Sequence, residues 1–118
     1  MDERLQKALD FSNYMVTLNN QKRVYKQQYR ENIVYYFNRG QFTVTQTLIT
    51  FVNMLVEKSI TEDVVLIDDN ETPILIEDLE EFSQNILNQY FSVTNQYYAD
   101  FAQLLNKRNV EKLVGYDK

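Results

Sequence analysis

Cysteine, histidine and tryptophan are absent from this 118-residue chain, which contains one proline and two glycines. The absence of cysteine excludes a disulfide framework, a thiolate zinc site and a cysteine nucleophile. The absence of histidine removes the commonest general base and the commonest ligand of transition metals. The scarcity of glycine and proline disfavours an all-β fold, which needs many turns, and favours long helices.

Long apolar runs are also missing. No stretch reaches the roughly 18 apolar residues that span a bilayer, and the first residues, MDERLQKALDF, are too charged for a signal peptide. We therefore expect an intracellular, soluble protein that is neither secreted nor bound to a membrane. Hydrophobic residues make up 44% and charged residues 25% of the chain, which together with the length indicates a single globular domain over residues 1–118.

The net charge of −5 is distributed unevenly. Residues 1–40 carry seven basic and four acidic side chains, whereas residues 57–81 carry ten acidic side chains and one basic one. Such polarity suits head-to-tail self-association or docking on a charged partner. A solvated acidic surface is the simpler explanation.

The hydrophobic pattern predicts a helix at about 2–38. Its apolar residues recur at steps of three, four or seven and form one stripe: Phe11, Met15, Leu18, Tyr25, Tyr29, Ile33 and Tyr36. Polar residues leave open a break near 19–20, and Gly40 is expected to end the helix in a left-handed conformation. An alternative is a small hairpin in which residues 34–37 pair with residues 41–44.

The rest of the chain predicts one more hairpin and further helices. A helix is expected at about 44–58, with a capping box formed by Thr43 and Gln46. Two β-branched runs around the turn DDNET predict a β-hairpin at about 64–76. Asp78 then stands at the N-cap of a long helix at about 79–106, followed by a short helix or tail at 108–118. The expected fold is mainly α, with long amphipathic helices in an elongated bundle and one β-hairpin.

The acidic turn is the one place where the sequence suggests chemistry. Asp68, Asp69 and Glu71 offer carboxylates, but Pro73 falls where a calcium EF-hand loop needs a ligand or a glycine. No acid lies isolated in an apolar run, where its pKa would rise to suit acid catalysis. We therefore expect no enzyme activity, metal or cofactor, and a turn whose acids are available to a partner.

Tyrosine is abundant, with nine residues. Basic residues between positions 22 and 30 alternate with Tyr25 and Tyr29, a pattern that suits single-stranded nucleic acid. An acidic protein nevertheless lacks the usual basic footprint of a nucleic-acid binder, and tyrosine also supplies contact area at protein interfaces. We therefore expect protein partners, and a homo-oligomer above all, at the aromatic stripes that contain Tyr25, Tyr29, Tyr36, Tyr90 and Tyr97.

The segments FSNYMVTLNNQKR, YYFNRGQFTV and VLIDDNETPILIEDLEEF resemble small uncharacterised proteins encoded by T4-like marine phages that infect cyanobacteria. This resemblance implies no functional residues. It implies work in the cytoplasm of a host bacterium or in the virion.

The last segment, NVEKLVGYDK, is similar in style to the C-termini with which T4-like replication and late-transcription proteins engage the sliding clamp. That similarity would make anchors of Val110, Leu113, Val114 and Tyr116. The segment lacks a phenylalanine, however, and Gly115 interrupts it, so a frayed helix end explains it more simply.

Taken together, these features predict a non-enzymatic protein of the assembly or scaffolding type that acts through protein–protein contacts. The alternative is a regulatory accessory protein that binds the transcription or replication machinery.

Overall fold

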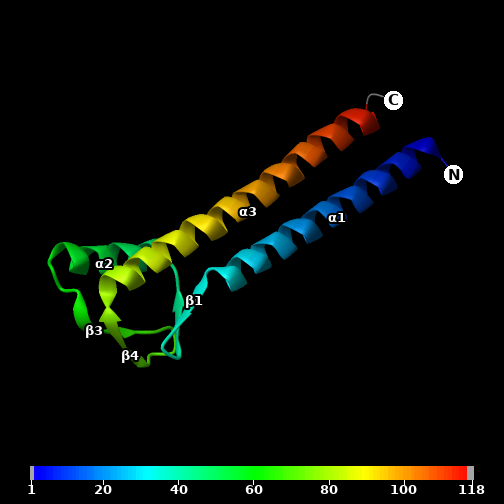
Figure 1. The fold of residues 1–118 in the computed structure, drawn as a ribbon. Helices are drawn as coiled ribbons and strands as arrows, with labels where there is room; N and C mark the ends of the chain where they lie inside the picture. The colour runs from blue at the N-terminus through cyan, green and yellow to red at the C-terminus, as the bar shows by residue number, and fades with distance from the viewer. Residues whose placement is uncertain (1, 117–118) are drawn as a thin grey trace. The chain divides into compact units, whose positions relative to one another are not determined.

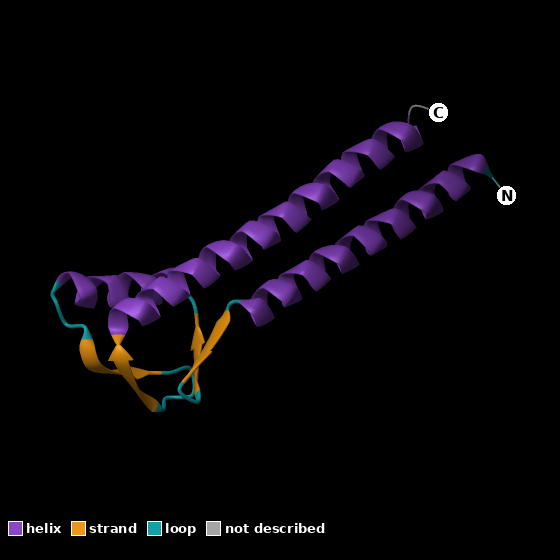
Figure 2. Ribbon diagram, viewed as in Figure 1, coloured by secondary structure: helices purple, strands orange, loops and turns teal. Residues whose placement is uncertain are grey.

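A computed structural model of the chain describes residues 2–116, and the side chains of residues 2–106. Its elements (Figures 1 and 2) are α1 (Glu3–Asn32), β1 (Val34–Phe37), β2 (Gly40–Thr43), α2 (Gln46–Glu57), β3 (Glu62–Ile67), β4 (Pro73–Asp78) and α3 (Leu79–Tyr116). The strands form two antiparallel two-stranded sheets, β1–β2 and β3–β4. The prediction of a mainly α fold with a β-hairpin at about 64–76 is confirmed. Over the described residues, no helix combines the length and apolarity needed to cross a membrane.

The chain divides into two compact units. The helical unit consists of Met1–Gln28 and Gln96–Lys118, and the hairpin unit consists of Tyr29–Asn95. The division falls inside α1 and α3, so each long helix contributes residues to both units. The single domain expected from the sequence stays a prediction.

The first helix ends earlier than predicted. It runs unbroken through residues 19–20 and stops at Asn32, where the β1–β2 hairpin replaces the expected helix end at about 38. Asn38 and Arg39 connect the strands with φ values of 50° and 68°, and two positive φ values in succession are typical of a type I′ turn. The alternative that the sequence left open, a hairpin around NRG, is therefore correct, but its second strand lies at residues 40–43 instead of 41–44.

Gly40 begins β2 and does not end a helix. Its φ is not positive, so the left-handed conformation expected from the sequence is wrong. The glycine is needed for close packing instead. A Cβ at this position would lie 2.7 Å from Ile74 Cγ1 in β4 and 3.1 Å from the carbonyl oxygen of Phe37.

Hydroxyl and carboxylate caps begin the other two helices. The N–H of Leu48 donates to Thr45 Oγ1 at 3.0 Å, so the predicted cap at Thr43 is wrong and α2 starts two residues later than expected. The N–H of Glu81 donates to Asp78 Oδ1 at 3.2 Å, which confirms Asp78 as the cap of α3.

The last helix is longer than predicted, since α3 continues to Tyr116 without a break near 106–108. The candidate clamp-binding anchors therefore lie within its last turns. Their side chains fall outside the described residues: Val110, Leu113, Val114 and Tyr116.

The hairpin unit has a compact apolar core. Phe82 of α3 lies at its centre, and its ring makes edge contacts with three aromatic rings of the first hairpin at centroid distances of 5.2 to 5.7 Å. The side chain of Gln89 donates from Nε2 to the carbonyl oxygens of Asn32 and Val34, both at 2.8 Å. These bonds join α3 to the point where α1 gives way to β1. The buried residues are Ile33, Phe42, Val44, Val52, Leu66, Ile74, Ile76, Leu79, Phe82 and Ile86.

In the helical unit, α1 and α3 run antiparallel (Figure 1). Leu18 and Leu104 are the buried hydrophobic side chains of this unit among residues 2–106. The ammonium group of Lys22 lies 5.7 Å from the ring centroid of Phe101. A cation over an aromatic face is favourable, so the lysine belongs to the contact between the helices.

Candidate protein-interaction surfaces

Asp68 is the buried charged residue of the part of the chain whose side chains are described, with 7% of its surface exposed. Its carboxylate accepts three backbone N–H groups, from Gln41 at 3.0 Å, Asn70 at 3.0 Å and Thr72 at 2.8 Å. Gln41 belongs to β2, so the carboxylate joins the second hairpin to the first. Asp68 is thus engaged within the chain and is not available to a partner.

The N–H group of Gln41 is the main reason why the pKa of Asp68 lies below its usual value of 3.8. The N–H groups of Thr72 and Asn70 lower the pKa further, because hydrogen bonds to a carboxylate favour its charged form. Desolvation by burial acts in the opposite direction and is outweighed.

Asp69 also contacts the first hairpin. Its N–H donates to the carbonyl oxygen of Gln41 at 2.8 Å, and its Oδ2 accepts from Thr43 Oγ1 at 2.6 Å and from Gln41 Nε2 at 3.4 Å. Glu71, with a φ of 61°, is exposed in the turn. Within the described residues no three acids come together as a metal site would require. DDNET is therefore a turn that also joins the two hairpins.

The predicted tyrosines are distributed over both units. Tyr25 and Tyr97 are half-buried in the helical unit, whereas Tyr36 is exposed on β1 of the hairpin unit. Tyr29 and Tyr90, both half-buried, line one hollow of the hairpin unit. The five tyrosines are thus divided between the two units.

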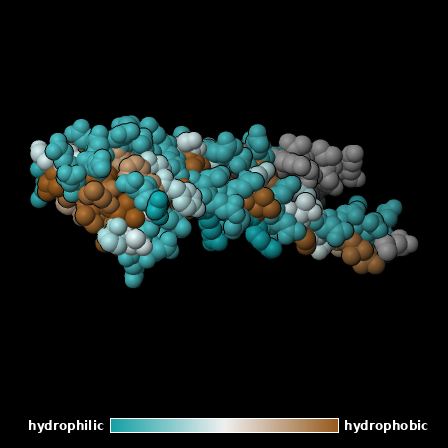
Figure 3. Space-filling view, turned by 60° about the horizontal axis from the view of Figure 1, so that its bottom comes forward, coloured by the Kyte–Doolittle hydropathy of each residue, from teal (hydrophilic) through white to brown (hydrophobic). Residues whose placement is uncertain are grey.

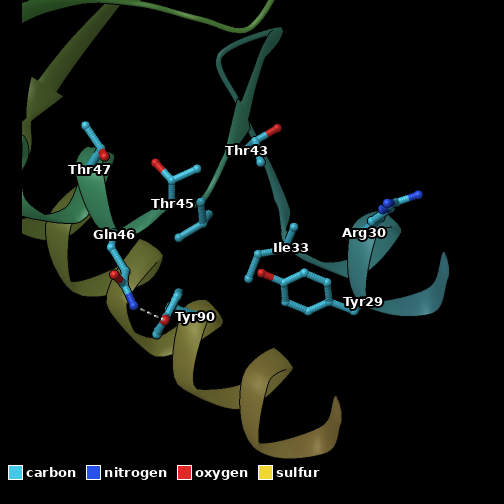
Figure 4. A pocket seen from close by; sticks show the side chains of 9 residues that line it. Tyr29, Arg30, Ile33, Thr43, Thr45, Gln46, Thr47 and Tyr90 are labelled. Atoms are coloured by element: carbon cyan, nitrogen blue, oxygen red, sulfur yellow. Dashed lines mark hydrogen bonds between the residues drawn. The ribbon is translucent and has the colours of Figure 1, made fainter. Parts of the chain in front are cut away.

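That hollow has a volume of about 590 Å³ and is open to solvent (Figure 4). Three threonines, at the end of β2, at the cap of α2 and in its first turn, line one side (Thr43, Thr45 and Thr47), and the exposed Arg30 lies in the last turn of α1. Gln46 Nε2 donates to the hydroxyl oxygen of Tyr90 at 2.9 Å, which joins two of the residues that line the hollow. The lining can form hydrogen bonds, and it contains no pair of acid and base groups for catalysis.

The outer surface of the second hairpin is apolar and exposed. We call it the hairpin face, and it comprises Val65, Ile67, Pro73 and Leu75. The exposed fractions are 57% for Val65, 62% for Ile67 and 44% for Leu75. Val65 lies opposite Leu75 and Ile67 opposite Pro73 in the strand register, so the four side chains form two adjacent cross-strand pairs. Figure 3 shows hydrophobic side chains gathered on the part of the molecule that contains the hairpins, with hydrophilic ones around them.

The hairpin face was not predicted, although the sequence contains a signal for it. The runs VVLI and PILI are apolar at every position, and in a two-stranded hairpin every second residue faces away from the core. Val64, Leu66, Ile74 and Ile76 point inward and are buried or half-buried. The intervening apolar residues are therefore left on the outside.

Acidic residues flank the hairpin face at both ends. Glu62, Asp63 and Glu77 lie where β3 begins and β4 ends, and Asp69 and Glu71 lie in the turn. All five are exposed. The surface therefore combines an apolar centre with a negatively charged rim.

A second exposed apolar surface lies on the helical unit. Leu5, Leu9 and Val16 are exposed on α1. At 3.6 residues per turn they lie within about 40° of one another and about 140–180° around the helix from Leu18. We call these three residues the outer stripe, because they face away from the side of α1 that packs on α3.

Comparison with family models, with curated proteins and with solved structures finds no match to this chain. The resemblance to phage proteins therefore stays a prediction, and functional inference has to begin from the surfaces described above.

Proposed function

We propose that this protein is a non-enzymatic assembly protein that acts through protein–protein contacts and forms a homo-oligomer through its helical unit. The observation that carries the proposal is the outer stripe. Three large apolar side chains lie in line on a helix whose opposite side is already packed.

Over the side chains that the structure describes, up to residue 106, the helical unit has little core of its own. Residues 3–28 of α1 belong to this unit and extend about 39 Å. Among the described side chains of the unit, however, the buried hydrophobic ones are Leu18 and Leu104. Helical pairs usually complete such a core by packing against further helices, as in four-helix bundles. A second copy supplies two helices of the same kind, and a two-fold contact would cover both outer stripes at once.

The charge of the helical unit is compatible with self-association. Residues 1–28 carry five basic and three acidic side chains, so positive and negative charges are mixed along α1. The dense acidic segment of the chain, residues 57–81, belongs to the hairpin unit. A contact between two helical units therefore does not require acidic segments to meet.

The test is the solution mass, measured by light scattering on a sizing column at two protein concentrations. We expect a dimer or larger assembly for the native chain, and a smaller species for Val16→Lys, because a charge in the covered stripe opposes burial. Val24→Lys is the matched control. Val24 is also a valine of α1 and is similarly exposed, at 52% against 57% for Val16. It lies about 80° from Val16 around the helix, outside the outer stripe.

A native chain that is monomeric at both concentrations would overturn the proposal. It would favour the alternative, a monomeric accessory protein that docks on the transcription or replication machinery. Equal effects of Val16→Lys and Val24→Lys would show that the outer stripe is not the contact.

A further inference from the structure

We propose that the open edge of β3 binds an extended segment of another protein as an added β-strand, and that this segment alternates apolar with basic residues. The partner is a protein other than this chain, and the binding surface is separate from the outer stripe. The proposal therefore does not depend on self-association.

The strand register shows which backbone groups of β3 are free. Asp68 N donates to the carbonyl oxygen of Thr72, and hydrogen-bonded pairs alternate with non-bonded pairs along an antiparallel ladder. Leu66 with Ile74 is therefore the next bonded pair. The N–H and C=O groups of Val65 and Ile67 then point away from β4, toward the open edge.

The two edges of this hairpin differ in protection. On the β4 edge, Pro73 has no N–H to offer, and Asn38 Nδ2 donates to the carbonyl oxygen of Leu75 at 2.9 Å. The β3 edge is less protected. Its sequence, EDVVLI, contains no proline and no lysine, the residues with which proteins commonly block an edge strand. Asp63 is the residue of β3 with a positive φ, of 53°. Two free N–H and two free C=O groups remain between Asp63 and the turn.

The side chains next to this edge favour an apolar partner strand. Val65 and Ile67 are both more than half exposed, and a strand paired with β3 would place every second side chain on the same surface. Cross-strand apolar pairs stabilise a sheet. An added strand would thus extend the hairpin face from two strands to three and cover part of its exposed apolar surface.

Charge decides between a second copy of the hairpin and a different protein. Residues 57–81 carry ten acidic side chains and one basic one, and Glu62 and Asp63 lie at the start of β3 itself. Pairing β3 with β3 of another copy would bring two acidic segments together, which is unfavourable. A segment with lysine or arginine between its apolar residues carries positive charge, which the acidic residues at both ends of the hairpin attract.

The test uses a capped peptide that alternates lysine and valine, acetyl-KVKVKVK-amide, with amide hydrogen exchange followed by NMR. With peptide at ten times its Kd, we expect the amides of Val65 and Ile67 to exchange about tenfold more slowly. The amide of Leu66 should change less, because its N–H is already in the ladder. The exchange rates report backbone pairing directly. Contact between side chains alone would not slow exchange at Val65 and Ile67 while sparing Leu66 between them.

Two control peptides separate backbone pairing from charge. N-methylation of the valines removes their N–H donors while keeping charge and apolar surface, and should abolish the protection. Replacement of lysine by glutamate should abolish binding by repulsion. Tight binding without protection of Val65 and Ile67, or equal binding of the N-methylated peptide, would refute strand addition. Equal binding of the glutamate peptide would refute the basic partner.

Variants of Ile67 test the edge from the side of the protein. Ile67→Pro removes an outward N–H and no ladder bond, and should weaken peptide binding at least tenfold. Ile67→Thr keeps the N–H and should bind more tightly than Ile67→Pro. Thermal melts are to check that both variants fold, and equal affinity of the two folded variants would overturn the proposal. Val16→Lys should bind the peptide as the native chain does, so failure of self-association remains distinguishable from failure at β3.

Discussion

Asp68 shows how one side chain determines the contact between two hairpins. Its carboxylate is buried and accepts N–H groups from its own turn and from β2. Polar groups removed from water need hydrogen-bond partners, so this acid is a structural element and not a docking charge. The exposed acids around it, Glu71 among them, remain available to a partner.

This arrangement predicts a specific pH dependence of stability. Because the pKa of Asp68 is lower in the folded chain than its usual 3.8, the ionised carboxylate stabilises the fold. That contribution is complete at pH values above this unfolded pKa and is lost as the pH falls through the folded pKa. Asp68→Asn should lower the melting temperature at neutral pH and reduce the further loss on acidification below about pH 4.

Thermal melts between pH 7 and pH 2 measure this effect, with Glu71→Gln as the control from the same turn. Glu71 is exposed, so its replacement should leave the melting temperature at neutral pH nearly unchanged. Similar behaviour of the two variants would mean that Asp68 does not join the hairpins in solution.

Gly40 gives a second prediction at the residue scale. Gly40→Ala should destabilise the fold by about 1–3 kcal/mol, as added atoms do in a packed core, because the new Cβ would meet Ile74 Cγ1. Ile74→Ala removes that atom, so the double variant should be more stable than the sum of the two single effects implies. Urea denaturation measures the coupling, and strict additivity would contradict the close approach.

At the scale of the element, α3 provides one side of the hairpin core over its first turns. Leu79, Phe82 and Ile86 are buried at steps of three and four residues, the spacing of one helix face. Asp78 determines where this face begins, because its side chain caps the helix. These three residues therefore form the face of α3 that packs against the hairpins.

Ile86→Ala tests this face of the helix. Ile86 is fully buried, and truncation of a buried isoleucine to alanine removes about 2–5 kcal/mol of unfolding free energy. Tyr98→Ala, at a position of α3 that is exposed, should change the free energy by less than about 0.5 kcal/mol. Urea melts of both variants give the comparison, and a loss below about 1 kcal/mol for Ile86→Ala would place the wrong face in the core.

At the scale of the whole molecule, the two candidate surfaces lie in different units. The outer stripe belongs to the helical unit and the hairpin face to the hairpin unit. The first has mixed charge and suits another copy of the chain, whereas the second has an acidic rim and suits a basic partner. If both proposed contacts form, the protein would join copies of itself to a second protein, as the proposed assembly role requires.

The sequence by itself determined the helical character, the second hairpin and the cap of α3. These features depend on local rules: hydrophobic periodicity, β-branched runs around a polar turn, and a carboxylate three residues before an N–H group. It also contained the uneven charge that distinguishes the two candidate partners. Local rules left the segment 34–44 undecided, since its aromatic residues suit either a helix end or a strand.

Only the tertiary structure decided the remainder, because long-range contacts override local preference. Val34 to Phe37 form a strand that Gln89 and Phe82, about fifty residues away in sequence, hold in place. Gly40 is required by Ile74, and Asp68 is buried by Gln41. The exposure of Val65 and Ile67 likewise depends on which face of the hairpin meets the core. Sequence periodicity cannot supply that choice when both faces are apolar.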